Sequence, residues 1–131
     1  MAKIIVAAGL VILEDDKVLL NQHGDPAFWK FCGGKVEDSD KDLIETACRE
    51  AKEEMGIDIE IINPEPFLVY TKKETMNGDC DVILIHYLAK RIGEIKPDAG
   101  IRQWDWLPLK GIENQDLAPN ILLALKHFNF I

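Results

Sequence analysis

The stretch GGKVEDSDKDLIETACREAKEEMGI, residues 33–57, places two adjacent glycines ahead of the strongest helical pattern in the chain. Apolar residues recur there at the spacing of one helical face, which predicts a helix over about residues 40–55. Gly56 stands where a residue in the left-handed conformation commonly ends a helix. This helix is expected to pack on a sheet built from the strands around it.

The residues just before the helix offer several N-terminal caps. Asp38 or Ser39 can accept hydrogen bonds from the first helical amides. Ser39 with Asp42 also forms an S-x-x-D capping box. The sequence therefore predicts a helix that begins beside Ser39.

Three carboxylates gather on one side of this helix. Glu50, Glu53 and Glu54 stand at positions i, i+3 and i+4, where like charges repel one another. Their arc borders the apolar arc of the helix, so the carboxylates are expected to project from the rim of the buried face. The apolar arc consists of Ile44, Ala47, Ala51 and Met55, with Cys48 at its edge.

Such a charge run usually decorates a solvated helix face. Two features favour a different interpretation here: the acids lie at the edge of the packing face, and the diglycine Gly33–Gly34 precedes the helix. A diglycine lets the backbone approach a ligand closely, and its carbonyls can join carboxylates around a hard cation. The cluster therefore predicts a site for Mg²⁺ or Mn²⁺, which prefer oxygen ligands and often bridge phosphates.

Length and charge limit the classes of protein to which this chain can belong. A chain of 131 residues is expected to form a single domain over residues 1–131. Fifteen Lys and Arg against 23 Asp and Glu give a formal net charge of −8, which argues against binding to nucleic acid or to an anionic membrane. A polyanionic small-molecule substrate would need help from a bound cation. A monomer and a homodimer are both compatible with the sequence.

The cysteines and the N-terminus indicate where the protein works. Cys32, Cys48 and Cys80 lie far apart and form no C-x-x-C pair, which favours reduced thiols over a disulfide framework or a zinc ribbon. The start superficially resembles a short signal sequence, but no clear cleavage site follows, and a buried strand is the preferred interpretation. We expect a soluble, cytoplasmic protein without a membrane-spanning segment.

The remaining segments alternate between strand and turn patterns. The expected fold is α/β (α+β), with a mixed sheet between helices in an α/β/α sandwich. The expected strands are 3–13 and 17–20 as a hairpin, a short extended piece at 28–32, then 57–62, 66–75, 80–90 and 102–109, with a hairpin turn at MNGD (76–79) and a second helix over 117–128.

Residues 33–57 resemble the Nudix box, whose pattern is G-x5-E-x7-R-E-U-x-E-E-x-G-U with U an aliphatic residue. One residue is inserted relative to this pattern at the start of the helix, because counting back from Arg49 reaches Lys41 and counting forward from Gly34 reaches Asp40 where the pattern has glutamate. The preceding FWKFCGGKVE resembles the W-x-F-P-G-G-K lead-in of MutT-like members, with Cys32 in place of proline. The second half of the box matches in full, at Arg49, Glu50, Ala51, Glu53, Glu54, Gly56 and Ile57.

The resemblance implies hydrolysis of a nucleoside diphosphate linked to another group, with a divalent metal and water. The preferred substrate is a nucleoside triphosphate, standard, oxidised or otherwise non-standard, which would give the monophosphate and pyrophosphate by attack of water on phosphorus. Hydrolysis of ADP-ribose, a nucleotide sugar or a dinucleoside polyphosphate is the alternative within the enzymes. A module that binds a nucleotide without cutting it is a third possibility, suggested by the inserted residue and the missing box glutamate.

The resemblance also implies roles for individual residues of the box. Glu50, Glu53 and Glu54 would hold the metal together with the carbonyl of Gly34. Glu53 or Glu50 would serve as the general base. Arg49 would orient a glutamate through charge-assisted hydrogen bonds, or would form an ordinary surface ion pair.

The resemblance to MutT-like members also implies four candidates outside the glutamate cluster. Asp98 would supply another acid to the metal, although KPDAG also fits a plain turn. Asn120 could read a base edge or simply cap the second helix. His23 would lie near the phosphates or be a neutral loop histidine. Lys35, in the GGK motif, is a candidate contact to substrate.

Overall fold

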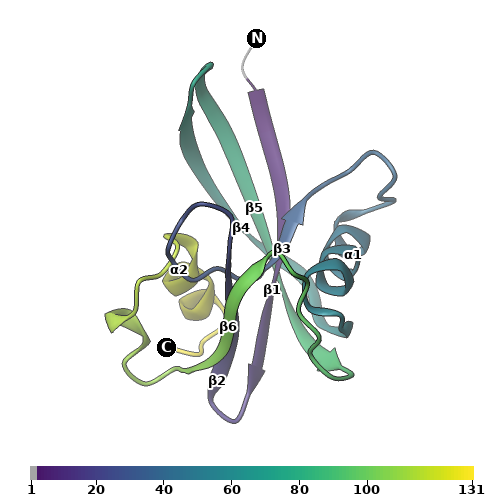
Figure 1. Cartoon of the computed structure of the whole chain (residues 1–131), viewed down its shortest axis with the longest axis vertical. Helices are drawn as coiled ribbons and strands as arrows, with labels where there is room; N and C mark the ends of the chain where they lie inside the picture. Colours follow the sequence, from purple (N-terminus) through teal and green to yellow (C-terminus); the bar gives the residue numbers. More distant parts are fainter. Residues whose placement is uncertain (1–2) are drawn as a thin grey trace.

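The computed structural model describes residues 3–131, and within them six strands form one mixed sheet between two helices (Figure 1). The strand order is β4-β5-β1-β2-β6, with β3 paired to β1; β1 and β5 are parallel and the other pairs antiparallel. The expected mixed α+β sandwich is therefore confirmed. The elements are β1 (Lys3–Glu14), β2 (Lys17–His23), β3 (Cys32–Lys35), α1 (Leu43–Met55), β4 (Asp58–Thr75), β5 (Gly78–Ile92), β6 (Ile101–Pro108), a 3-10 turn η1 (Ile112–Asn114) and α2 (Asn120–His127).

Each helix covers its own face of the sheet. Along β1, Leu10 and Ile12 belong to the core under α1, whereas Val11 between them belongs to the core under α2. This alternation follows from the two-residue period of a strand that is buried on both faces. On α1 the predicted packing arc is confirmed, because Ala47, Ala51 and Met55 are fully buried. The α2 face consists of Ile121, Ala124 and Leu125.

Two hairpin turns form where the sequence predicts them. β1 and β2 pair through Leu13 and Val18, and the turn between them places Asp15 and Asp16 at φ 51° and 60°. Aspartate tolerates this left-handed region better than most residues. The second hairpin joins β4 to β5 and, with the start of β1, extends beyond the helices (Figure 1).

The two strands predicted at 57–62 and 66–75 are one long strand, β4, with two irregularities. Its register against β5 shifts between Ile61 and Asn63 and again between Asn63 and Phe67. Pro64 and Pro66 lie in this interval, and proline has no N–H to give to the ladder. The prolines therefore interrupt the pairing for a few residues without ending the strand.

Helix α1 begins later than predicted. Its first residue is Leu43, and its cap is Asp42, whose side chain accepts the Glu45 N–H at 2.8 Å. The predicted caps Asp38 and Ser39, and the capping box between Ser39 and Asp42, are wrong. The predicted end is confirmed, since Gly56 adopts φ 69° and donates its N–H to the Lys52 carbonyl.

Helix α2 also begins three residues later than predicted, at Asn120. The three preceding residues instead run along the loop before β3: Leu117 forms a bridge with Trp29, and the Ala118 N–H donates to the Trp29 carbonyl at 2.9 Å. No helix in the described part of the chain is long and apolar enough to cross a membrane.

Candidate active site

Glu54 is held at the point where α1 meets β3. Its Oε1 accepts the Gly33 N–H at 2.8 Å, and the Cys32 side chain lies beside this carboxylate. Its side chain is only 13% exposed. Burial is the main reason that the pKa of Glu54 is raised to about 7. The carboxylate is thus fixed in position and short of compensating positive charge.

Glu50 lies against the second glycine of the pair. A Cβ added at Gly34 would stand 2.3 Å from the Glu50 carboxyl carbon, so only glycine leaves room for this side chain. Burial raises the pKa of Glu50, although the Arg49 guanidinium donates to its Oε1 at 2.8 Å. The diglycine predicted to admit a ligand therefore also admits the carboxylates themselves.

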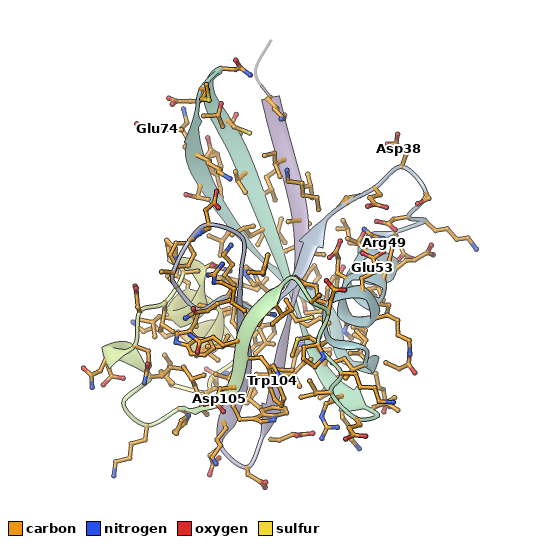
Figure 2. All side chains as sticks on the ribbon, in the orientation of Figure 1. Asp38, Arg49, Glu53, Glu74, Trp104 and Asp105 are labelled. Carbon is orange, nitrogen blue, oxygen red and sulfur yellow. The ribbon has the colours of Figure 1, made fainter. Side chains whose placement is uncertain are left out.

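Arg49 ties the glutamates to the loop before the helix. Its Nη1 donates to Glu50 at 2.8 Å and to Glu53 at 3.2 Å, and Figure 2 shows Arg49 and Glu53 side by side on α1. Its Nη2 also donates to the Lys35 carbonyl at 3.0 Å. A guanidinium fits this role because its donors lie in one rigid plane. Arg49 therefore orients two glutamates at once.

Of the two residues that can stand at the first glutamate position of the box, Asp40 and Lys41, it is Asp40 that binds Arg49. Its two oxygens accept from Arg49 Nε and Nη2 at 2.9 and 3.0 Å. It also accepts from the Glu37 N–H and the Thr46 hydroxyl. These bonds hold the pKa of Asp40 well below its usual range. Both oxygens of Asp40 are thus occupied, and Asp40 links the loop before α1 to Arg49 on the helix.

An acidic cavity of about 360 Å³ opens beside the glutamates. Glu53, Glu54 and Asp98 line it, and Asp98 is fastened there by its N–H, which donates to the Glu54 carbonyl at 2.8 Å. The Glu53 side chain is 58% exposed, the most open of the three glutamates. The fold therefore brings Asp98 to the acid cluster from the segment that precedes β6.

A second, mostly apolar cavity of about 280 Å³ lies beneath α2. Phe28, Phe31 and Leu84 provide apolar walls, and Asn120 and His86 line it as well. The Asn120 side chain does not cap α2; its amide nitrogen lies 2.8 Å from His86 Nε2. Asn120 thus carries a polar amide at an otherwise mostly apolar cavity.

His23 lines both cavities and so marks where they meet. Its Nδ1 lies 3.0 Å from Asn21 Oδ1 and 3.5 Å from Glu54 Oε2. Burial, with Lys30 and Arg102 nearby, lowers the pKa of His23. A neutral imidazole that donates toward a carboxylate is the state that this environment favours.

The sequence analysis missed Lys30 and His86, which also line the apolar cavity. Burial is the main cause that lowers the pKa of Lys30, and its Nζ donates to the His23 carbonyl at 3.3 Å. The signal for His86 was a single polar residue within the apolar run VILIHYLA. Lys35, which was predicted to contact substrate, is exposed and lines neither cavity.

A protein-family model identifies the family to which this chain belongs. The sequence model of the NUDIX domain matches residues 3–128. The chain belongs to the NUDIX family. The resemblance of residues 33–57 to the Nudix box is thereby confirmed, and the chain is a Nudix hydrolase of the MutT-like kind.

Solved Nudix structures share the fold over almost the whole chain. A MutT NUDIX hydrolase from Burkholderia pseudomallei is 26% identical, covers 95% of this chain and 97% of its own, and superposes with a TM-score of 0.76. An Ap4A hydrolase from C. elegans is 24% identical over 95% of this chain and 94% of its own, with a TM-score of 0.76.

A third relative binds a different compound. The NUDIX domain of Shewanella oneidensis NrtR, solved with ADP ribose, is 22% identical, covers 98% of this chain and 86% of its own, and has a TM-score of 0.67. A comparison with curated protein sequences gives no match. Because these similar folds act on or bind different compounds, the Nudix fold by itself does not assign a substrate.

Nudix proteins generally use divalent metal ions, and the donor set of this chain fits such an ion. Among residues 3–131 no three His, Cys, Asp or Glu side chains already surround a common point. Arg49 and the Gly33 N–H instead hold Glu50, Glu53 and Glu54 from different sides. All candidate ligand atoms are hard oxygens, and burial raises the pKa of two of these carboxylates, Glu50 and Glu54, so a bound cation would stabilise their charged forms.

The raised pKa of Glu54 predicts that the metal-free Nudix domain loses stability as the pH rises. An ordinary glutamate titrates near 4.5, so folding favours the protonated form of Glu54. Its contribution to stability is full below that value and is lost as the pH rises through about 7. We expect the Tm in EDTA to fall over this window and Mg²⁺ to raise it again at the alkaline end. The change Glu54→Gln should remove this slope; an unchanged slope would assign it to other groups.

Proposed function

We propose that this Nudix domain, a single domain over residues 1–131, hydrolyses a nucleoside triphosphate to the monophosphate and pyrophosphate with Mg²⁺ or Mn²⁺. The observation that carries the proposal is the junction of two unlike cavities at His23. One cavity is acidic and suits a metal with the phosphates, whereas the other is apolar and suits a flat base. A nucleotide has this same division between a polyanionic and an aromatic part.

Glu50, Glu53 and Glu54 would hold the metal, with the Gly34 carbonyl and Asp98 completing the oxygen donors. A bound divalent ion would neutralise the phosphates and lower the pKa of its water. Glu54 and Glu50 are the better fixed ligands, because their side chains are 13% and 15% exposed and are held by β3 and Arg49 respectively.

Glu53 is the better candidate for the general base. It lines the acidic cavity, its side chain is the most exposed of the three, and Arg49 binds only its Oε2. Its other oxygen is left to accept a proton from the attacking water. Water would add its hydroxyl to one phosphorus of the anhydride between the first and second phosphates while Glu53 takes the proton. The bond from that phosphorus to the bridging oxygen would break, and the products would be the monophosphate and pyrophosphate.

His23 would meet the substrate where the two cavities join, and Lys30 would meet it in the apolar cavity. His23 donates from Nδ1 on the side of Glu54, and Lys30 brings a positive charge to the apolar cavity. Asn120 would read the base edge. These assignments rest on the lining residues of the cavities.

Hydrolysis of ADP-ribose, a nucleotide sugar or a dinucleoside polyphosphate is the second candidate function. The Ap4A hydrolase and the ADP ribose complex among the similar structures favour testing it. A binding module without hydrolysis has less support, because Asp40 occupies the partner position of Arg49 despite the inserted residue.

A release assay tests the proposal. Purified protein is incubated with nucleoside triphosphates, oxidised purine nucleotides, sugar nucleotides and dinucleotides, and pyrophosphate and phosphate are measured with Mg²⁺, with Mn²⁺ and with EDTA. We expect pyrophosphate from at least one triphosphate, and a loss of at least about 100-fold in EDTA. Equal rates with and without metal, or release only from sugar nucleotides or dinucleotides, would overturn it.

A further inference from the structure

His86 is a buried histidine whose two ring nitrogens both have partners. It is 1% exposed and stands in the middle of β5, paired with Gly9 on one side and Phe67 on the other. Its Nδ1 lies 3.0 Å from the Phe67 carbonyl oxygen. Its Nε2 lies 2.8 Å from the amide nitrogen of Asn120, the first residue of α2.

These partners fix the state of the ring. A carbonyl oxygen can only accept, so Nδ1 must carry the hydrogen. Burial lowers the pKa of His86, which keeps the ring neutral and leaves Nε2 as an acceptor. The ring is also held edge-on to Phe31, with centroids 5.6 Å apart. His86 therefore offers one acceptor in one direction.

The acceptor in turn fixes the amide of Asn120. An asparagine amide can flip by half a turn, but only its nitrogen end can donate to Nε2. One N–H is thus used by His86, and the oxygen Oδ1 and the second N–H remain. Because Asn120 lines the apolar cavity, a ligand there that reached its amide would meet an acceptor beside a donor, which complements a base edge that carries an N–H next to an acceptor.

We propose that His86 is a positioning residue that holds the Asn120 amide in one orientation and thereby sets how the apolar cavity recognises the base of a nucleotide. The inference rests on the proposed function only in that the ligand is a nucleotide. His86 acts through Asn120 and through the shape of the wall. Binding of the phosphate part does not depend on it.

Two substitutions separate the two bonds of the ring. Asparagine at position 86 carries an amide nitrogen near the place of Nδ1, so His86→Asn can keep the bond to Phe67 and loses the one to Asn120. Glutamine reaches the place of Nε2, so His86→Gln can present an oxygen to Asn120. His127→Phe is a matched control, because His127 stacks on Phe67 from α2 but does not line the cavity.

The measurement is calorimetric binding of AMP, GMP, CMP and UMP, with ribose 5-phosphate as the ligand without a base. We expect His86→Asn to weaken the best-bound nucleotide about 10-fold and to leave ribose 5-phosphate unchanged. His86→Gln and His127→Phe should stay within about 2-fold of the parent. With the matching triphosphate, KM should rise while kcat changes little.

A double-mutant cycle completes the test. In an Asn120→Ala background, His86→Asn should have almost no further effect on nucleotide binding. Equal losses in the Asn and Gln variants, a parallel loss of ribose 5-phosphate binding, or additive effects with Asn120→Ala would overturn the inference. Since monophosphate binding needs no turnover, the inference can hold if hydrolysis is never found, and can fail while hydrolysis stands.

Discussion

Replacing Glu53 with glutamine is expected to lower the rate of nucleotide hydrolysis by about 100- to 10,000-fold while the fold is retained. Glutamine keeps the size of the side chain and its contact with Arg49, but it neither accepts a proton from water nor contributes charge to the metal. Because the Glu53 side chain is 58% exposed, the neutral amide can be solvated and should not destabilise the domain.

Pyrophosphate release with Mg²⁺ and thermal unfolding together check this expectation. Glu45→Gln is the matched control, since Glu45 is another acid of α1 that lines neither cavity, and its variant should hydrolyse at close to the parent rate. A Glu53→Gln protein that turns over substrate at the parent rate would remove Glu53 from the chemistry. An equal loss in both variants would mean that helix charge in general is responsible.

Replacing either glycine of the diglycine with alanine should be harmful, but in different ways: Gly33→Ala should lower stability, whereas Gly34→Ala should lower the rate of hydrolysis. At Gly33 a Cβ would lie 2.2 Å from the Ala8 carbonyl oxygen and 2.6 Å from the Gly9 Cα, which are backbone atoms of the paired strand. Strands β1 and β3 must separate to admit it. We expect Gly33→Ala to cost about 3 kcal/mol of unfolding free energy, or roughly 10 °C in Tm.

At Gly34 the added Cβ meets the end of the Glu50 side chain, which can rotate away. Gly34→Ala should therefore cost about 1 kcal/mol or less, yet lower hydrolysis at least about 10-fold because a proposed metal ligand is displaced. Extra Mg²⁺ should restore part of the lost rate.

Gly9→Ala is the matched control for stability, because Gly9 pairs directly with Gly33 and its added Cβ would have ordinary contacts of 3.6 and 3.7 Å. Chemical denaturation of the three variants checks the order. If Gly33→Ala were as stable as Gly9→Ala, the close approach of β1 and β3 would be disproved.

Much of this molecule was predictable from local pattern. The helix with three glutamates, its end at Gly56, the two hairpins and the family all followed from short motifs and from periodicity. The predicted caps of α1 were wrong: Asp38 and Ser39 lie before its start, and Asp42 caps it. Asp40, where the helix was expected to begin, instead lies outside it and binds Arg49 with both oxygens, a contact that the local pattern does not show.

The candidate site also contains some features that the sequence predicted and others that it did not. The glutamate cluster was visible because its members are neighbours on one helix. The partner of Asn120 was not visible, because His86 lies 34 residues away and reaches it only through the placement of α2 over β5. Asp98 was a candidate only through the resemblance, and in the structure its N–H donates to the Glu54 carbonyl, which brings it beside the glutamates.

The sequence by itself determined the acid cluster, the diglycine and the family, because these depend on bonds and periodicities within a few residues. Only the tertiary structure decided which acid meets Arg49, how the Asn120 amide faces, and that His23 stands between two unlike cavities. The first depends on how the loop before α1 folds back onto the helix. The other two depend on the sheet order and on the placement of α2 over β5, which join segments whose separation along the chain carries no local signal.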